Sequence, residues 1–473
     1  MYKSVESCVR WNGELSESFQ CLKGVKQGCI LSPLLFSLLI NDVANYVFEK
    51  GRHGLQIIPQ TREIFSLLFA DDIVLLSSTP QGLQNQINNL AIKSKELGLE
   101  VNLEKTKIMV FRKGGFLGKR EQWFYEGVKL DVVNQYKYLG YLITTKLSFE
   151  EVCDDISRKA KGKITDLFKT MWAIGNIDTN IFFQLFDCQI KPILLYGSEV
   201  WGGFASESIE SAHLFALKRL LNVGEKTPNT LVYGETGRYS INIDVTLSYI
   251  KYWLKVMKLP ISRFPRQVLA LLYRTLDQID AKSKQNWLTK VRDCLKDNGF
   301  SGVWEAGEVY NEDAFLRILK NKLIETFKLN WMSKLRSSDR FATYRLFKTE
   351  FGQELYLDDL TIKKFRDCLI RFRIGINELG INKRFQISNV QSKNCPFCEN
   401  SLEDEEHFLF VCHAYNSIRN KYLIGNYEFE NVLFLQDPNI DVKRKTAMYI
   451  FYSLKCREEK LINQTTILDV TRA

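Results

Sequence analysis

The feature that most constrains the fold of this chain is a pair of adjacent carboxylates inside an apolar stretch, LLFADDIVLLSS at residues 67–78. The flanking runs, residues 64–70 and 73–76, favour β-strands, so the pattern predicts a hairpin with Asp71 and Asp72 at or beside its turn. Ionised carboxylates at the tip of a buried hairpin need a compensating cation or hydrogen-bond donor. A metal ion is one such cation. The alternative is a pair of ordinary exposed turn residues.

Composition limits the class of protein. The 473 residues are 45% hydrophobic, enough for a sizeable core and more than one domain. Lys and Arg outnumber Asp and Glu by 65 to 55, and this net charge of +10 favours a polyanionic partner. The sequence shows neither a signal-peptide pattern nor an uncharged run long enough to span a membrane, so we expect an intracellular protein. In a reducing compartment the eleven cysteines stay free or bind metal.

Helix and strand patterns alternate around the carboxylates. Upstream, residues 24–43 contain a glycine turn that runs into an apolar helix started by Pro33. Downstream, residues 81–97 carry an amphipathic helical stripe that stops at Gly98, and strand-like character returns in residues 97–111 and 136–144.

From Ser148 onward the pattern is mostly helical. Ser148 and Glu151 form a capping box. The apolar residues that follow recur at helical spacing, at Val152, Ile156, Ala160, Ile164, Leu167 and Met171. We therefore expect a long helix that packs one face.

This order of segments resembles the palm of a reverse transcriptase, specifically that of the non-LTR (LINE-type) retrotransposon family. The matching segments are KQGCILSPLLFSLLINDV at 26–43 (motif B), residues 67–78 (motif C), LEVNLEKTKIMVF at 99–111 (motif D) and YKYLGYLI at 136–143 (motif E). The later segment IKPILLYGSEVWG, residues 190–202, also resembles the part that follows the palm in these elements.

The resemblance implies an RNA-directed DNA polymerase that uses Mg²⁺, with an RNA template, a DNA primer or target and deoxynucleotides as partners. It implies Asp71 as a direct Mg²⁺ ligand with Asp72 assisting, and Lys105 beside the leaving pyrophosphate. The positions that it assigns to template, nucleotide or primer are Gln27, Gly28, Ser32, Pro33, Asn102, Tyr138, Leu139 and Gly140. From the residues alone, Lys105 is also explained as a solvated turn lysine, and the segment at Tyr138 as a core strand.

The sequence departs from the family at one point. Adjacent side chains in a strand point to opposite faces, so Asp71 and Asp72 do not cage two metal ions by themselves. The family supplies a further aspartate from motif A, upstream of motif B, and residues 1–23 contain no aspartate. We therefore expect a catalytically incomplete enzyme, unless an upstream polypeptide segment supplies fingers and motif A.

A second group of ligand-type residues lies near the C-terminus, in CPFCENSLEDEEHFLFVC at 395–412. Cys395, Cys398, His407 and Cys412 offer three thiolates and one imidazole, the ligand set of a closed structural Zn²⁺ site. The spacing also resembles the C-terminal zinc knuckle of LINE-type proteins. A redox Cys-x-x-Cys is the alternative, and His413 could replace Cys412. Zinc here would order a small module that cannot fold alone.

Two further patterns invite a functional interpretation. The Tyr-Leu-Asp-Asp at 356–359 superficially matches a polymerase motif, but Asp358 or Asp359 is better explained as the N-cap of the next helix. Residues 317–348 interleave nine basic residues with aromatic ones, and residues 363–384 repeat the mixture. Basic side chains can bind phosphates while rings stack on unpaired bases; the alternative is a helix with a solvated basic face.

The sequence therefore predicts an α+β chain: a partial reverse-transcriptase palm, a mainly α-helical region and a small zinc-knuckle module. The predicted parts are the palm at 1–145, thumb-like helices at 146–225, a helical basic connector at 226–385, the knuckle at 386–425 and a helical tail at 426–473. The alternative function is a non-catalytic relic that binds nucleic acid through basic helices and the knuckle. We expect it in a nuclear or cytoplasmic ribonucleoprotein.

Overall fold

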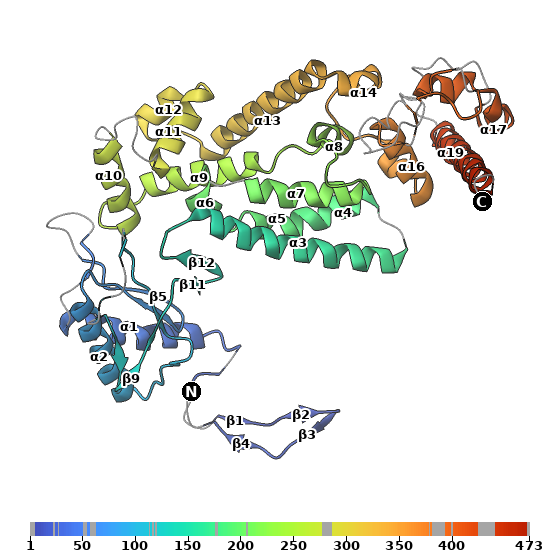
Figure 1. Cartoon of the computed structure of the whole chain (residues 1–473). Helices are drawn as coiled ribbons and strands as arrows, with labels where there is room; N and C mark the ends of the chain where they lie inside the picture. The colour runs from blue at the N-terminus through green and yellow to red at the C-terminus, as the bar shows by residue number, and fades with distance from the viewer. Residues whose placement is uncertain are drawn as a thin grey trace. The chain divides into compact units, whose positions relative to one another are not determined.

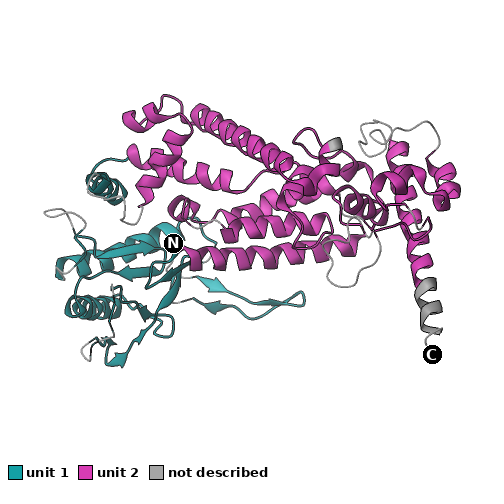
Figure 2. Ribbon diagram, turned by 45° about the horizontal axis from the view of Figure 1, so that its top comes forward, with its two compact units in different colours: residues 1–148, 259–283 teal, residues 149–258, 284–473 magenta. Residues whose placement is uncertain are grey.

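The computed structural model of the chain describes residues 5–21, 24–26, 28–50, 54–56, 63–112, 114–115, 118, 121–175, 178–204, 207–276, 286–377, 379–380, 393–398, 401–423 and 440–470. The chain divides into two compact units (Figure 2). Unit 1 is Met1–Ser148 with Leu259–Ser283, and unit 2 is Phe149–Lys258 with Lys284–Ala473. Unit 1 mixes strands with helices and unit 2 is helical, which confirms the α+β class. The five-part division stays a prediction.

Unit 1 contains short strands that pair two by two, together with helices (Figure 1). Its helices are α1 (Ser32–Lys50), α2 (Pro80–Glu96) and α10 (Phe264–Leu276). Its strands are β1 (Glu6–Ser7), β2 (Arg10–Trp11), β3 (Glu14–Leu15), β4 (Phe19–Gln20), β5 (Ser66–Phe69), β6 (Asp72–Leu75), β7 (Lys107–Ile108), β8 (Phe124–Tyr125), β9 (Val128–Lys129), β10 (Asp131–Val132), β11 (Gln135–Tyr138) and β12 (Tyr141–Thr144). All pairs are antiparallel except β10 with β7, which is parallel.

The helices predicted on either side of the carboxylates are present. Helix α1 starts at Ser32 and Pro33, where a proline costs no helical hydrogen bond. Helix α2 is capped by the Thr79 side chain, which accepts from the N–H of Gly82 at 3.1 Å. It ends at Glu96 before Gly98, whose φ of 68° suits a helix end.

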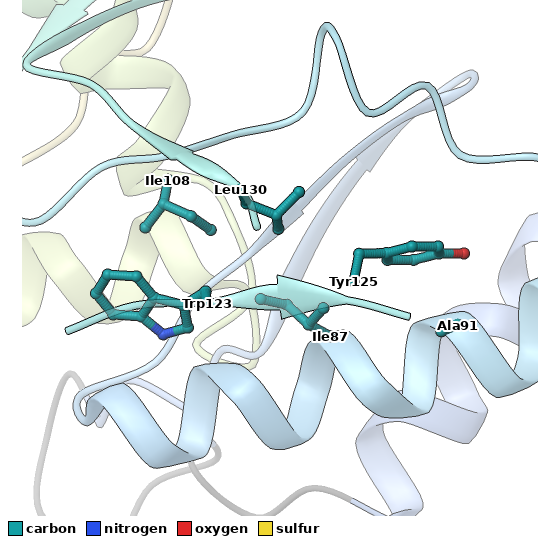
Figure 3. Close-up of a cluster of buried hydrophobic side chains, with 6 residues drawn as sticks. All are labelled: Ile87, Ala91, Ile108, Trp123, Tyr125 and Leu130. Atoms are coloured by element: carbon teal, nitrogen blue, oxygen red, sulfur yellow. The ribbon is translucent and has the colours of Figure 1, made fainter. Parts of the chain in front are cut away.

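The core of unit 1 forms between α2 and the strands that follow it. Figure 3 shows six buried side chains that pack together: Ile87, Ala91, Ile108, Trp123, Tyr125 and Leu130. The Trp123 indole N–H donates to the carbonyl of Pro80 at 3.0 Å, so the largest side chain of this cluster is also hydrogen-bonded. Gln84 exchanges two hydrogen bonds with the backbone of Phe124. These contacts fix β8 to α2.

Unit 2 is built from helices. They are α3 (Phe149–Ile174), α4 (Thr179–Leu185), α5 (Lys191–Leu194), α6 (Ser198–Trp201), α7 (Glu207–Leu220), α8 (Asn229–Thr236), α9 (Asn242–Met257), α11 (Trp287–Asp297), α12 (Ser301–Ala306), α13 (Glu312–Ser337), α14 (Ala342–Phe347), α15 (Tyr356–Asp359), α16 (Lys363–Arg373), α17 (Asn416–Tyr422) and α19 (Ile440–Val470). Shorter helical turns are η1 (Phe186–Ile190), η2 (Asp339–Phe341), η4 (His407–Val411) and η5 (His413–Tyr415). No helix in the described ranges is both long enough and apolar enough to span a membrane.

Helix α3 confirms the predicted long amphipathic helix. It begins one residue after Ser148, and every apolar residue of the predicted stripe is buried. Helix α7 lies beside α3 and runs parallel to it, because Ser208 contacts Asp154 at one end and Arg219 contacts Thr165 further along (Figure 1).

Candidate active site and metal centre

The two adjacent aspartates lie at the turn of a hairpin, as predicted. Strands β5 and β6 pair Phe69 with Asp72, which leaves Ala70 and Asp71 as a two-residue turn. Ala70 has a φ of 51°, the sign that the first turn residue of a type II′ turn requires. Buried Gln86 of α2 donates from Nε2 to the carbonyl of Leu76 at 3.0 Å. This bond anchors the base of the hairpin to α2.

The expectation that this hairpin is buried was wrong. Leu67, Leu68 and Phe69 of β5 are exposed, Phe69 by 61%, and so are both aspartates. Within the described residues β5 pairs along one edge only, with β6. Because carboxylates in water carry no desolvation cost, their position at this tip does not by itself require a cation.

The β11–β12 hairpin brings a second predicted site residue to the aspartates. Tyr138 pairs with Tyr141, and the turn residues Leu139 and Gly140 have φ values of 48° and 79°, the two positive angles of a type I′ turn. Burial, and then the negative charge of Asp72, raise the pKa of Tyr138. Asp72 therefore lies close enough to Tyr138 to act on it electrostatically.

The motif B positions form the entry to α1. Gly28 has a φ of 83°, and the space where a Cβ would stand is open, so its backbone conformation rather than packing calls for glycine. The buried Ser32 hydroxyl donates to the carbonyl of Lys26 at 2.7 Å and closes the turn before the helix. Pro33 is exposed in the first helical turn. Gln27 lies outside the described residues.

The motif D positions form a side-chain-capped turn. The Asn102 side chain accepts from the backbone N–H of Lys105 at 3.0 Å, and the Tyr136 hydroxyl donates to the Lys105 carbonyl at 3.1 Å. Both Asn102 and Lys105 are exposed. The Lys105 ammonium makes no ion pair within the described part of the chain. The structure thus places Lys105 as an exposed turn lysine, which agrees with the alternative interpretation.

The aspartate pair is short of ligands for two metal ions. Among the described residues, the only group of three or more metal-ligand side chains is the Cys/His group in unit 2. Asp71 and Asp72 are hard oxygen donors of the kind Mg²⁺ prefers, but no third carboxylate of the described ranges joins them. The fit to a two-metal site is thus partial.

The four predicted ligands in the C-terminal part of unit 2 do come together. The side-chain donor atoms of Cys395, Cys398, His407 and Cys412 all lie within 4.8 Å of one another. The Cys412 Sγ lies 3.7 Å from the Sγ of both Cys395 and Cys398. A tetrahedral Zn²⁺ with Zn–S bonds of about 2.3 Å places its sulfurs about 3.8 Å apart, so the spacing fits zinc.

The protonation state of His407 also fits a metal. The His407 Nε2 is buried and makes no hydrogen bond, so it is a free acceptor for a cation. Burial lowers the pKa of His407, which favours the neutral imidazole that binds metal. Burial raises the pKa of Cys412 to about 12 and also raises that of Cys395, so the metal-free thiols hold their protons. His413 Nδ1 lies 3.4 Å from Cys398 Sγ and remains the alternative ligand.

Helices α17 and α19 hold the segment that carries His407 and Cys412. The Tyr449 hydroxyl of α19 donates to the carbonyl of Phe408 at 2.7 Å, and Arg419 of α17 donates to the carbonyl of Cys412 at 3.0 Å. Arg457 of α19 forms a buried ion pair with Glu403. Sequence reasoning missed these supporting residues, because no local pattern links Glu403 to a partner 54 residues away.

The Tyr-Leu-Asp-Asp segment has a structural role, but the predicted N-cap was wrong. Its four residues are themselves the short helix α15, and the N-cap position of α16 is Ile362, which has no capping side chain. Asp359 instead pairs with buried Lys443 of α19, and Asp358 accepts from Gln353 at 2.9 Å. Asp359 therefore forms an ion pair with a residue distant in sequence and does not cap α16.

In residues 317–348, most basic side chains are exposed, whereas several of the aromatic side chains are buried. Trp331, Phe341 and Tyr344 are buried in the core of unit 2, while Arg317, Lys322 and most other basic residues of α13 are exposed. The buried rings cannot stack on bases, so the structure favours a solvated basic face here.

Comparison with known proteins identifies the family. The family described as "Reverse transcriptase (RNA-dependent DNA polymerase)" matches residues 2–143. A putative uncharacterized transposon-derived protein of Caenorhabditis elegans is 30% identical over 169 residues, 34% of this chain and 58% of that protein. A probable RNA-directed DNA polymerase from transposon BS of Drosophila melanogaster is 29% identical over 188 residues, 38% of this chain and 20% of its own length.

A third relative is a retrovirus-related Pol polyprotein from the type-1 retrotransposable element R2 of Nasonia vitripennis, 32% identical over 126 residues, 25% of this chain and 12% of the polyprotein. The chain thus spans a little over half of the first of these relatives and a fifth or less of the other two. The family match coincides with the segment that holds the aspartate hairpin and the Tyr138 turn. The chain therefore carries, over residues 2–143, a reverse transcriptase domain of the non-LTR (LINE-type) retrotransposon family.

Proposed function

We propose that this chain contributes the nucleic-acid- and metal-binding part of an RNA-directed DNA polymerase. The observation that carries the proposal is the exposed Asp71–Asp72 turn inside the segment that matches reverse transcriptases, with Tyr138 within electrostatic reach of Asp72. Asp71 would bind Mg²⁺ with Asp72 assisting, and the Tyr138 turn would hold the primer backbone. The substrates would be an RNA template, a primer and deoxynucleotides. When bound, Mg²⁺ would activate the primer 3′-hydroxyl and stabilise the leaving pyrophosphate.

We further propose that residues 1–473 by themselves extend primers poorly or not at all. Two adjacent carboxylates leave a two-metal site one ligand short within the described residues. The exposed apolar residues of β5 and its unpaired edge suit the addition of a further strand. A polypeptide segment that brings an aspartate on such a strand would complete the site.

Primer extension tests both statements. The purified chain would be assayed on a primed RNA template with Mg²⁺ and deoxynucleotides, beside Asp71→Asn and the control Asp166→Asn, an exposed aspartate of α3. We expect little extension by the unmodified chain, with template binding retained. If the unmodified chain and Asp166→Asn extend the primer but Asp71→Asn does not, the proposal that the chain is catalytically incomplete is overturned. The polymerase assignment is then supported. Failure to bind template at all would contradict the proposed function.

We propose that the Cys/His group binds one structural Zn²⁺ per chain, because the orphaned His407 Nε2 and the sulfur spacing fit that ion. Cys398→Ser should lower the zinc content of the purified protein well below one per chain. Cys188→Ser, which changes an exposed cysteine outside the group, should leave it near one. Equal zinc in both variants would refute the ligand assignment.

A second candidate function is binding of nucleic acid without catalysis. The exposed basic residues of α13 and the Cys/His group support it. Two results together would favour this candidate. Asp71→Asn would still bind template, and the unmodified chain would extend no primer, either alone or with an added segment that supplies the missing aspartate.

A further inference from the structure

An exposed tryptophan in unit 2 lies among cations from two other helices. Trp172, near the end of α3, is 46% exposed. The Arg219 guanidinium of α7 lies 5.0 Å from the centre of the Trp172 ring, and the Lys363 ammonium of α16 lies 5.3 Å from it. We call these three residues the Trp172 cluster. Segments far apart in sequence thus place one half-exposed indole and two positive charges together.

Within the described residues, the two cations of the Trp172 cluster, Arg219 and Lys363, form no ion pair with a carboxylate, although Lys363 acts electrostatically on Asp367 one turn further along α16. Arg219 packs its guanidinium over Phe168 at 5.3 Å and Phe215 at 5.7 Å, so its position is fixed by aromatic rings. Lys363 is exposed on a flexible chain that can swing from the ring to a ligand. Both cations are therefore available to an anion.

The Trp172 cluster differs from the aromatic residues at 317–348. Trp331 is buried, and its indole N–H donates to the carbonyl of Thr230 at 2.7 Å. Its ring is consequently part of the core. By contrast, the Trp172 ring is accessible to solvent, and the Arg219 cation beside it could bind a phosphate. An exposed aromatic ring beside unpaired cations matches the chemistry of unpaired bases and their phosphates.

We propose that the Trp172 cluster is a contact site for single-stranded nucleic acid, in which one unpaired base stacks on Trp172 while Arg219 and Lys363 bind the flanking phosphates. The inference rests on the proposed nucleic-acid-binding function and gives it a location in unit 2. Stacking is tolerant of sequence because every base has a π-face, so the site would read no particular sequence.

Equilibrium binding of two fluorescent RNA probes tests this site. One is a single-stranded oligonucleotide of mixed sequence, and the other has the same length but lacks its bases. Trp172→Ala should weaken binding of the first about 5- to 150-fold, the loss expected for one stacked base, and should leave the second almost unchanged. Trp172→Phe should retain most of the affinity. Tyr310→Ala, which removes a fully exposed ring elsewhere in unit 2, is the matched control and should have no effect.

The salt dependence of binding tests the cations separately. Lys363→Gln should lower the slope of log affinity against log salt by about 0.7, one phosphate contact on a single strand, and Lys296→Gln, an exposed lysine of α11, serves as its control. Equal affinity of Trp172→Ala and the unmodified chain for the first probe would overturn this site while leaving the proposed function standing. No binding by the unmodified chain would overturn both. If Trp172→Ala does not fold, Trp172→Leu on the first probe decides, because leucine keeps most of the side-chain bulk but offers no ring on which a base can stack.

Discussion

At the scale of single residues, two hairpin turns depend on residues that adopt positive φ angles. The Leu139–Gly140 turn needs two positive φ angles, and the Ala70–Asp71 turn needs one. Next to these turns lie Tyr138 and Asp72, and the charge of Asp72 raises the pKa of Tyr138. The sequence predicted the hairpin at Asp71 and strand-like character at residues 136–144, and the structure folds the latter into a second hairpin.

Also at the scale of single residues, the affinity of the Cys/His group for zinc should depend on pH. Zinc binds thiolates, and burial holds the pKa of Cys412 at about 12 without metal. Binding at neutral pH must therefore release protons, so zinc affinity should rise steeply between pH 6 and pH 8. His407 adds little to this slope above pH 6.5, because its lowered pKa keeps it neutral there. Competition with a chromophoric chelator at several pH values measures the slope, and a flat profile would contradict thiolate ligation.

The stability of the metal-free protein should show the opposite dependence. A thiol whose pKa is raised on folding binds its proton more tightly in the folded chain than in the unfolded one. The stabilising contribution of Cys412 is then complete below the ordinary thiol value near 9.0, and it is lost as pH rises from there toward 12. Chelator-treated protein should therefore unfold more readily above pH 9.

At the scale of elements, one buried ion network joins helices of unit 2. The guanidinium of Arg373 on α16 is fully buried, 3.3 Å from Glu235 of α8 and 2.7 Å from Glu354. The Tyr356 hydroxyl of α15 also donates to Glu235. Helix α8 thus shares one set of charges with α15 and α16, which lie far from it in sequence but next to each other. The network holds together because a buried unpaired charge is costly.

Removal of Arg373 should therefore cost far more than removal of an exposed arginine. Arg373→Met leaves the buried Glu235 without its cation, while Glu354 keeps its ion pair with Lys348, and should destabilise unit 2 by about 3–5 kcal/mol. Arg317→Met, on the exposed face of α13, should change stability by less than about 0.5 kcal/mol. Urea unfolding followed by circular dichroism compares them, and equal midpoints would show that the network contributes little.

At the scale of the whole molecule, the chain has two units with separate cores. Unit 1 depends on the cluster around Trp123, and unit 2 depends on the α3 stripe and the Arg373 network. Compact units with their own cores unfold as separate cooperative transitions when little couples them. We expect two transitions in calorimetry of the full chain.

Variants should assign these transitions. Trp123→Ala removes a 2% exposed side chain and should cost about 3–5 kcal/mol, shifting only the transition of unit 1. Arg373→Met and zinc removal should shift only that of unit 2. A single transition that moves with all three changes would show that the units unfold together.

The sequence by itself determined the local elements and the chemistry of the candidate sites. Hydrophobic periodicity placed α1, α2 and α3, turn residues placed the hairpin at Asp71, and ligand spacing selected the four residues of the Cys/His group. These features depend on neighbours within a few turns of chain, where spacing and propensity decide the outcome. The segment order also carried the resemblance to non-LTR reverse transcriptases, which the family comparison confirmed.

Only the tertiary structure decided which side chains are buried and what they meet. It exposed β5, placed Asp359 against Lys443 instead of at an N-cap, and buried Trp331 while leaving Trp172 half-exposed. It also joined Glu403 to Arg457 and Arg373 to Glu235. The reason is physical: the free energy of a buried charge or ring depends on partners that are distant in sequence and become neighbours only when the elements pack.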